Sequence, residues 1–206
     1  MEEYLVVQEI RNWIKETPTI VPIPNSSVEK AKEFAEHASQ LKMTEENHLY
    51  DNINEDGRSF IGKLGEIAIE ILFGRPIIDW NIGHSNDFNK PDLYVAGVGL
   101  GIKSVLERHL CPLVSKRDPK MPEIITVVHE IPILKASGTT QIIDHYDYSV
   151  YICGLATIDV LKNCRGDMFV KNKNKRNGPL KRKTAFWGFK YLKRFKNEDE
   201  LGRMLK

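Results

Sequence analysis

The sequence contains little cysteine and no long apolar run. Its three cysteines, Cys111, Cys153 and Cys164, form no Cys-x-x-Cys pair and no even set, which argues against a disulfide framework or a cysteine-based zinc site. No stretch approaches the roughly 18 consecutive apolar residues that a membrane-spanning helix requires. The N-terminus, Met1 to Tyr4, is acidic and lacks the basic start of a secretory signal peptide. We therefore expect reduced thiols, no membrane partner and a cytoplasmic location.

Acidic residues are absent from one long stretch. Residues Lys171 to Lys196 contain eleven Lys or Arg and no Asp or Glu, although the whole chain has a formal net charge of only +2. So many like charges repel one another unless a polyanion pairs with them. The segment therefore predicts a nucleic-acid partner. The side chains expected to contact it are Lys171, Lys173, Lys175, Arg176, Lys181, Arg182 and Lys183.

The aromatic residues of this basic segment have two interpretations. Trp187, Phe189 and Tyr191 can stack on unpaired bases, or they can pack into the core from a half-buried strand. The alternation of aromatic and polar residues from Phe186 to Tyr191 favours the core.

The remaining composition is that of one globular unit with an added lobe. A chain of 206 residues with 41% apolar and 28% charged residues can bury a sizeable core. We divide it into an N-terminal helical segment (1–50), a core (51–165) and a basic aromatic C-terminal segment (166–206) that packs on the core or continues it.

Helical periodicity dominates the first half of the chain. Apolar residues recur at helical spacing over 4–15, and a second helix is expected over 28–42 after the N-cap candidates at 25–27. A third helix is expected over 57–73, ended by Gly74-Arg75-Pro76. Glu66 and Glu70 are four residues apart in it and project on the same side.

Strand patterns follow this third helix. A strand start and a polar loop are expected over 77–88, and two strands over 92–96 and 98–105, joined around Gly97 and Gly99. Ile- and Val-rich runs predict further strands at 124–134, where Pro132 marks an edge or an end, and at 148–156. A short helix is expected at 157–164. Together these elements predict an α/β (α+β) fold with a central mixed sheet flanked by helices.

Three residues of the central region carry side chains suited to cleaving phosphodiesters. Asp92 opens a strand, Glu66 lies on the preceding helix, and Lys103 closes the next strand. Carboxylates such as Asp92 and Glu66 hold Mg²⁺, which needs only a few of them beside water and substrate oxygens. Lys103 can orient the attacking water or stabilise charge on the phosphate. The competing interpretations are a turn aspartate, an edge-strand lysine and a solvated helix face.

These residues resemble a known family. Pro91-Asp92 followed by an apolar strand that ends in Lys103 is similar to the PD-(D/E)XK nuclease superfamily, and Gly62-Lys63-Leu64-Gly65-Glu66 resembles the GxxGE helix of its phage-type and restriction-like members. The resemblance covers about 60–105, with weaker support from the strand at 148–156, and it implies that the core at 51–165 is restriction-endonuclease-like. It implies that Asp92, Glu66 and the Ile102 carbonyl hold Mg²⁺ or Mn²⁺, and that Lys103 is catalytic.

The sequence departs from the family at one position. The family's acid two residues before the lysine is Gly101 here. Glu66 can supply the missing carboxylate, with Glu70, Asp87 and Glu107 as further substitutes. Alternatively, the acid has been lost and only a nucleic-acid-binding protein remains.

The expected function is therefore a metal-dependent DNA endonuclease, a hydrolase that leaves a 5′-phosphate if it behaves as the family does. The resemblance also allows a homodimer that cuts both strands, and a phage-encoded protein in the host cytoplasm. Two other interpretations are weaker. Gly97 to Ser104 superficially resembles a phosphate-binding loop, but Ile102 interrupts the Gly-Lys-Ser order that such a loop needs. The basic segment could also bind an acidic protein.

Overall fold

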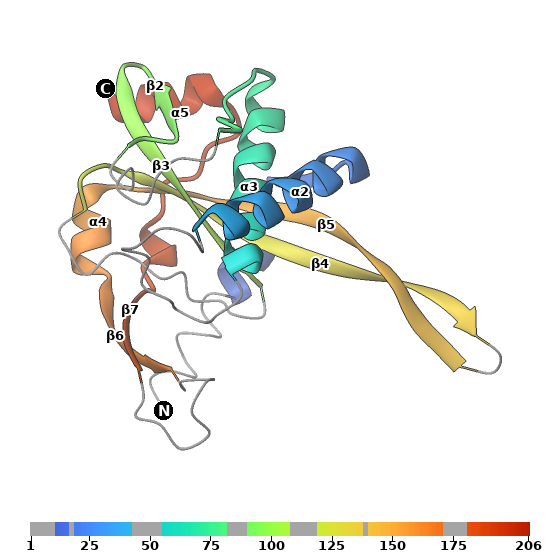
Figure 1. The fold of residues 1–206 in the computed structure, drawn as a ribbon. Helices are drawn as coiled ribbons and strands as arrows, with labels where there is room; N and C mark the ends of the chain where they lie inside the picture. The colour runs from blue at the N-terminus through green and yellow to red at the C-terminus, as the bar shows by residue number, and fades with distance from the viewer. Residues whose placement is uncertain are drawn as a thin grey trace.

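The centre of the computed structural model is a five-stranded mixed sheet. The model describes residues 11–16, 19–42, 55–81, 90–107, 119–137, 140–170 and 181–206. The strand order is β1-β5-β4-β3-β2, and a separate small sheet pairs β6 with β7 (Figure 1). In the large sheet β3 and β4 are parallel, and the other neighbouring strands are antiparallel. The strands are β1 (Ile20–Ile23), β2 (Leu93–Val95), β3 (Val98–Leu106), β4 (Glu123–Ser137), β5 (Thr140–Ala156), β6 (Arg165–Val170) and β7 (Lys181–Phe186).

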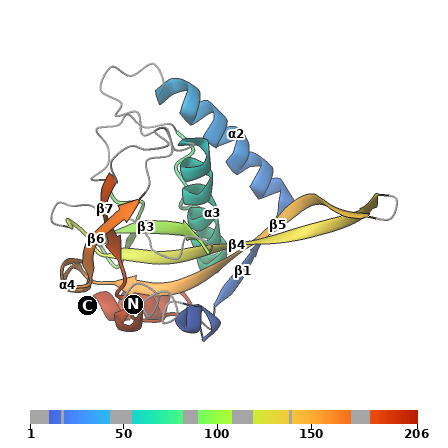
Figure 2. The same ribbon diagram turned by 90° about the horizontal axis from the view of Figure 1, so that it is seen from below.

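Helices flank this sheet, as the sequence predicts. Figure 2 shows α2 and α3 together on one side of it. The other face packs against α4, a short helical stretch at 11–16 and the aromatic residues that follow β7. The helices are α2 (Asn25–Lys42), α3 (Glu55–Phe73), α4 (Ile158–Asn163), α5 (Glu198–Leu205) and the short 3₁₀ helix η2 (Phe189–Tyr191). Among the described residues, no helix has the length and apolar character to cross a membrane.

Helix α3 is the element that lies closest to the sheet. Leu64, Ala68 and Ile69 are fully buried and pack with residues of β3, β4 and β5. The approach is closest at Gly65, where an added Cβ would lie 1.9 Å from the Ser104 Oγ atom and 2.9 Å from the Thr126 Oγ1 atom. Those two hydroxyls are hydrogen-bonded at 2.8 Å. Only glycine fits between the helix and these strands.

Gly65→Ala should therefore lower the free energy of unfolding by about 1–3 kcal/mol, because the added methyl overpacks a filled interface. Gly62→Ala is the matched control in the same helix, since nothing lies within 4 Å of its added Cβ. It should stabilise the protein by about 0.5–1 kcal/mol through helix propensity alone. Urea denaturation of both variants measures the difference, and equal stabilities would contradict the close contact at Gly65.

The second hydrophobic cluster contains aromatic residues of the C-terminal segment. Phe186 and Phe189 are buried on the sheet face opposite α3, beside Leu161 of α4. Phe195 is also buried, in the cluster on the α3 side. The prediction that the aromatics from Phe186 to Tyr191 belong to the core is therefore confirmed for Phe186 and Phe189. Trp187 and Tyr191 remain exposed, because the strand expected to continue to Tyr191 ends at Phe186 and a 3₁₀ helix follows.

The tight β2–β3 hairpin fixes the start of the candidate site. Ala96 and Gly97 both have positive φ, 49° and 81°, as a two-residue hairpin turn with the twist of its strands requires. The register pairs Leu93 with Leu100. Asp92, one residue before β2, therefore lies opposite Gly101.

Strands β4 and β5 are much longer than expected and form a projecting two-stranded ribbon (Figure 1). The β3–β4 pairing ends at Leu106 and Val128, and the β1–β5 pairing ends at Tyr148, so the ribbon beyond them lacks other strand neighbours among the described residues. Pro132 lies in this ribbon, where β4 is an edge strand, and it does not end the strand.

One strand was not predicted from the sequence, and one local expectation was wrong. Ile20–Ile23, in a proline-rich stretch, forms β1 and pairs with β5. Ile77, expected to start a strand, is irregular, because the Glu70 side chain takes the place of a neighbouring strand. The Glu70 Oε2 atom accepts the backbone N–H groups of Ile77 and Ile78 at 2.9 and 3.2 Å.

Candidate functional site

Asp92 is held at the start of the β2–β3 hairpin by two backbone contacts. Its N–H donates to the Leu100 carbonyl at 2.8 Å, which extends the hairpin by one rung. Its Oδ2 atom accepts the Ile102 N–H at 2.6 Å. The carboxylate is thereby fixed beside Gly101, where the predicted site places it.

The protein around Asp92 disfavours its ionised form. Although the residue keeps much of its surface accessible to solvent, desolvation of the carboxylate raises its pKa. The Ile102 N–H and the charges of Lys63 and Lys103 oppose this rise without cancelling it. An additional cation near Asp92 would therefore stabilise the carboxylate.

Lys103 is half-buried in β3 and points to the same sheet face as Gly101, two residues earlier. Its charge lowers the pKa of Asp92 and of Glu123 at the start of β4. One lysine thus acts electrostatically on two carboxylates from different strands. The catalytic role of Lys103 stays a prediction.

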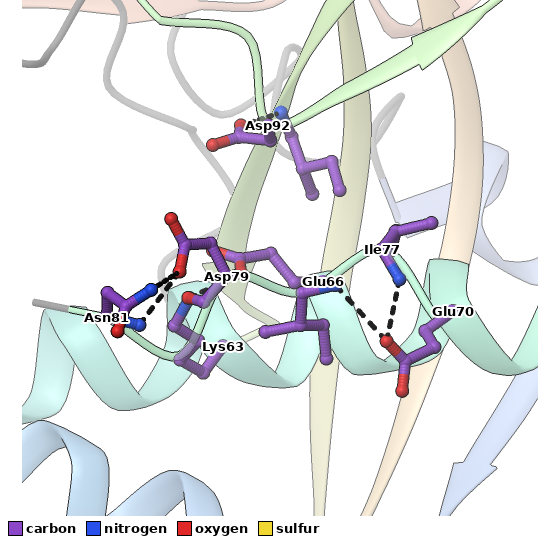
Figure 3. Close-up of polar contacts among 9 residues, drawn as sticks. Lys63, Glu66, Glu70, Ile77, Asp79, Asn81 and Asp92 are labelled. Atoms are coloured by element: carbon purple, nitrogen blue, oxygen red, sulfur yellow. Dashed lines mark hydrogen bonds and ion pairs between the residues drawn. The ribbon is translucent and has the colours of Figure 1, made fainter. Parts of the chain in front are cut away.

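Glu66 comes from α3, which covers the sheet face opposite to the one that Lys103 faces, and Lys63 holds it. The Lys63 Nζ atom donates to the Glu66 Oε2 atom at 2.6 Å and to the Asp79 carbonyl at 2.9 Å (Figure 3). Burial raises the pKa of Glu66, Lys63 opposes the rise, and the charge of Asp92 adds to it. Asp92 and Glu66 are therefore electrostatically coupled. Any cation bound by the Glu66 Oε2 atom would compete with Lys63.

The other predicted acids have different surroundings. Glu70 binds the backbone of the segment after α3 (Figure 3). Glu107 contacts the His129 Nδ1 atom at the far end of β3, six residues and about 20 Å of strand from Gly101. Asp87 lies outside the described residues.

Glu123 is the residue that the sequence analysis missed. The parallel register pairs it with Gly101, and an added Cβ on Gly101 would lie 3.3 Å from the Glu123 Cγ atom and 3.8 Å from the Asp92 Oδ2 atom. Desolvation raises the pKa of Glu123, Lys103 lowers it, and Asp92 raises it. The only signal in the sequence is a charged residue directly before the apolar run that begins at Ile124. Without the strand pairing, that signal does not lead to Gly101.

The side chains of the predicted DNA contacts lie outside the described part of the structure. Lys171, Lys173, Lys175 and Arg176 lie outside the described residues. The backbone of Lys181, Arg182 and Lys183 forms part of β7, but their side chains lie outside the described part of the chain. These contacts stay a prediction.

The chemistry of the site fits a hard divalent cation. Within the described ranges, no three His, Cys, Asp or Glu side chains converge closely enough to form a ready-made metal group. Mg²⁺ does not require one, since one or two carboxylates with waters and substrate oxygens usually hold it. The Glu123 Oε2 atom is buried and has no hydrogen-bond partner among the described groups. Ile102 contributes its N–H to Asp92, and the ligand role of its carbonyl stays a prediction.

A cavity of about 330 Å³ lies elsewhere, lined by Arg11, Glu107, Val128, His129 and Glu130. It is at the opposite end of the β3–β4 pair from Gly101 and Glu123. The carboxylates and Lys103 instead lie at the β2–β3–β4 corner. We place the candidate site at that corner because carboxylates and a lysine lie together there. The presence of a cavity was not used to choose it.

Comparisons with models of known protein families, with curated proteins and with solved structures gave no match.

Proposed function

We propose that this protein is a metal-dependent DNA endonuclease with a restriction-endonuclease-like core. The observation that carries the proposal is the position of the Asp92 carboxylate, which the Ile102 N–H holds at 2.6 Å beside Gly101, two residues before Lys103 on β3. The charge of Asp92 also raises the pKa of Glu66 on α3. The Gly62–Glu66 helix and Pro91-Asp92 support it by their resemblance to the nuclease superfamily. The acid-free basic segment supports DNA as the substrate.

In the proposed mechanism, Asp92 would hold a Mg²⁺ or Mn²⁺, which when bound would supply polarisation of the scissile phosphate and a water of lowered pKa. The Ile102 N–H keeps the Asp92 carboxylate oriented for this role. Glu66 is the second carboxylate, with its position set by Lys63. Lys103 stabilises the negative charge that grows on the phosphate during attack by water.

A second candidate function is a nucleic-acid-binding protein without activity. Glycine at position 101, where the family carries an acid, favours it. The two functions separate in one assay. Supercoiled, linear and single-stranded DNA are incubated with Mg²⁺ or Mn²⁺, and with a chelator as the control. The endonuclease should nick DNA only with metal and leave 5′-phosphates, whereas the binding protein should shift DNA without cutting it.

Lys103→Ala tests the mechanism within this assay. It should lower the cleavage rate about a hundredfold, because a preorganised group that stabilises the developing charge is removed. Binding of Mn²⁺ should persist, since Lys103 is not a ligand. Lys135→Ala is the control on the projecting ribbon, where Lys135 pairs with Asp144. Full cleavage by Lys103→Ala would reject its catalytic role.

DNA affinity has its own test. If the basic segment binds phosphates, the logarithm of the binding constant should fall linearly and steeply with the logarithm of salt concentration. A chain with neither cleavage nor salt-dependent DNA binding would contradict both candidate functions. The homodimer remains part of the proposal, and sedimentation analysis tests it.

A further inference from the structure

The Glu123 side chain lies beside Gly101, where β3 and β4 pair. They are register partners on parallel strands. An added Cβ on Gly101 would lie 3.3 Å from the Glu123 Cγ atom and 3.8 Å from both the Asp92 Oδ2 atom and the Met121 Sδ atom. The Glu123 side chain therefore extends over the position that a side chain on residue 101 would occupy, beside Asp92.

The Glu123 carboxylate lacks compensation at one oxygen. Its Oε2 atom is buried and has no hydrogen-bond partner among the described residues. Leaving a polar atom in this state costs free energy, and the cost is larger for a charged group. Lys103 compensates the charge in part, and Asp92 repels it. A cation between Glu123 and Asp92 would relieve both the unpaired oxygen and the repulsion.

We propose that Glu123 supplies, from the neighbouring strand, the metal-binding carboxylate that is absent at position 101. With Asp92 it forms a carboxylate pair for the divalent cation, in addition to the role that the proposed mechanism gives Glu66, and Gly101 is small because Glu123 passes over it. The acidic residue is thus on β4 instead of β3, at the position that pairs with Gly101. This inference rests on the proposed function for the identity of the cation, and it removes the main argument for an inactive protein.

One variant and a matched control test the ligand role by Mn²⁺ titration calorimetry. Glu123→Gln should weaken Mn²⁺ binding at least about tenfold, because one charged ligand is lost. Without metal it should melt at the same or a higher temperature than the native chain, since a buried charge is removed. Glu36→Gln, on the exposed side of α2, should change neither quantity. A purely structural glutamate would instead lower the melting temperature and leave Mn²⁺ affinity unchanged.

Moving the carboxylate back gives a stricter test. Glu123→Ala clears the space over residue 101, and Gly101→Glu added to it returns an acid to β3 beside Asp92. The double variant should recover Mn²⁺ affinity and metal-dependent cleavage that Glu123→Ala loses. Gly101→Glu alone should fit poorly, because Glu123 still occupies that space.

The outcomes separate this inference from the proposed function. If Glu123→Gln binds Mn²⁺ and cleaves DNA like the native chain while Asp92→Asn does neither, the endonuclease stands and the role of Glu123 is rejected. If the native chain cleaves no DNA but Glu123→Gln weakens Mn²⁺ binding, the metal site stands and the endonuclease is rejected. Failure of the double variant to bind Mn²⁺ better than Glu123→Ala would also count against the relocation.

Discussion

Asp92→Asn is expected to lower metal-dependent DNA cleavage about a thousandfold. A metal ion supplies several kcal/mol of charge stabilisation to such a reaction, and each 1.36 kcal/mol corresponds to a factor of about ten in rate. Asp92 is the acid that both the family resemblance and the structure place at the corner of β2 and β3. Removal of its charge should therefore have the largest effect on activity of any single side chain.

The asparagine substitution isolates the charge from the fold. The Asp92 Oδ2 atom accepts the Ile102 N–H at 2.6 Å, and the Asn side-chain carbonyl can accept the same hydrogen bond. The variant should melt at or above the native temperature, since burial disfavours the ionised aspartate. DNA affinity at fixed salt should be retained or should rise, because a negative charge facing phosphate has been removed.

Initial rates of plasmid nicking, measured at saturating DNA with Mg²⁺ and with Mn²⁺, check this expectation. Asp147→Asn on the projecting ribbon is the matched control, since its side chain is 45% exposed and the residue pairs with Ile131, beyond the end of the β3–β4 pairing. Nicking by Asp92→Asn at more than a tenth of the native rate would remove Asp92 from the metal site. It would also show that any nuclease activity of the preparation arises elsewhere or from a contaminant.

Local sequence patterns predicted the elements that carry the site. Apolar residues at helical spacing set the core-facing side of α3, and Gly97 between two apolar runs gave the β2–β3 hairpin. The pairing of Asp92 with the start of β3 follows from that hairpin alone, because its turn leaves only one register. Pairings between residues that are close along the chain could therefore be predicted from the sequence.

Pairings between segments that are far apart along the chain could not be predicted from the sequence. Gly101 and Glu123 are separated by 22 positions, and their parallel pairing depends on how the whole sheet assembles. Without that pairing, Gly101 indicates a missing acid, and the sequence suggests only Glu66, Glu70, Asp87 and Glu107 as its replacements. The Lys63–Glu66 contact is local, with a spacing of three residues on a helix, but its burial depends on Trp80 and Phe34, which lie beside the Lys63 ammonium. The spacing of two residues in the sequence predicts that their side chains meet on a helix. It does not predict how deeply other parts of the chain bury that contact.

Lys63→Met is expected to lower the free energy of unfolding by about 3–5 kcal/mol at neutral pH, because it leaves a buried carboxylate without its partner. Lys63 is only 7% exposed and donates to the Glu66 Oε2 atom at 2.6 Å and to the Asp79 carbonyl. Lys32→Met is the control, since Lys32 makes an ion pair with Glu29 whose side chains are 46% and 66% exposed. That variant should lose less than about 1 kcal/mol.

The loss in Lys63→Met should depend on pH with a defined sign. Burial raises the pKa of Glu66 above its usual value of 4.5, and Lys63 opposes that rise, so its removal raises this pKa further. A raised carboxyl pKa means that the folded state binds the proton more tightly than the unfolded state. The penalty is therefore full above the raised pKa and disappears below 4.5. Urea titrations between pH 4 and pH 8 should show the free energy of unfolding of Lys63→Met approaching that of the native chain at the acid end.

A second substitution distinguishes the buried charge from lost packing. Lys63→Met combined with Glu66→Leu should recover most of the stability at neutral pH, because two apolar side chains replace the ion pair. If the loss came from packing of the lysine stem against Phe34, the double variant would remain as unstable as the single one. Added Mn²⁺ extends the same argument to the site. It should stabilise Lys63→Met more than the native chain, since the Glu66 Oε2 atom is then released to a cation.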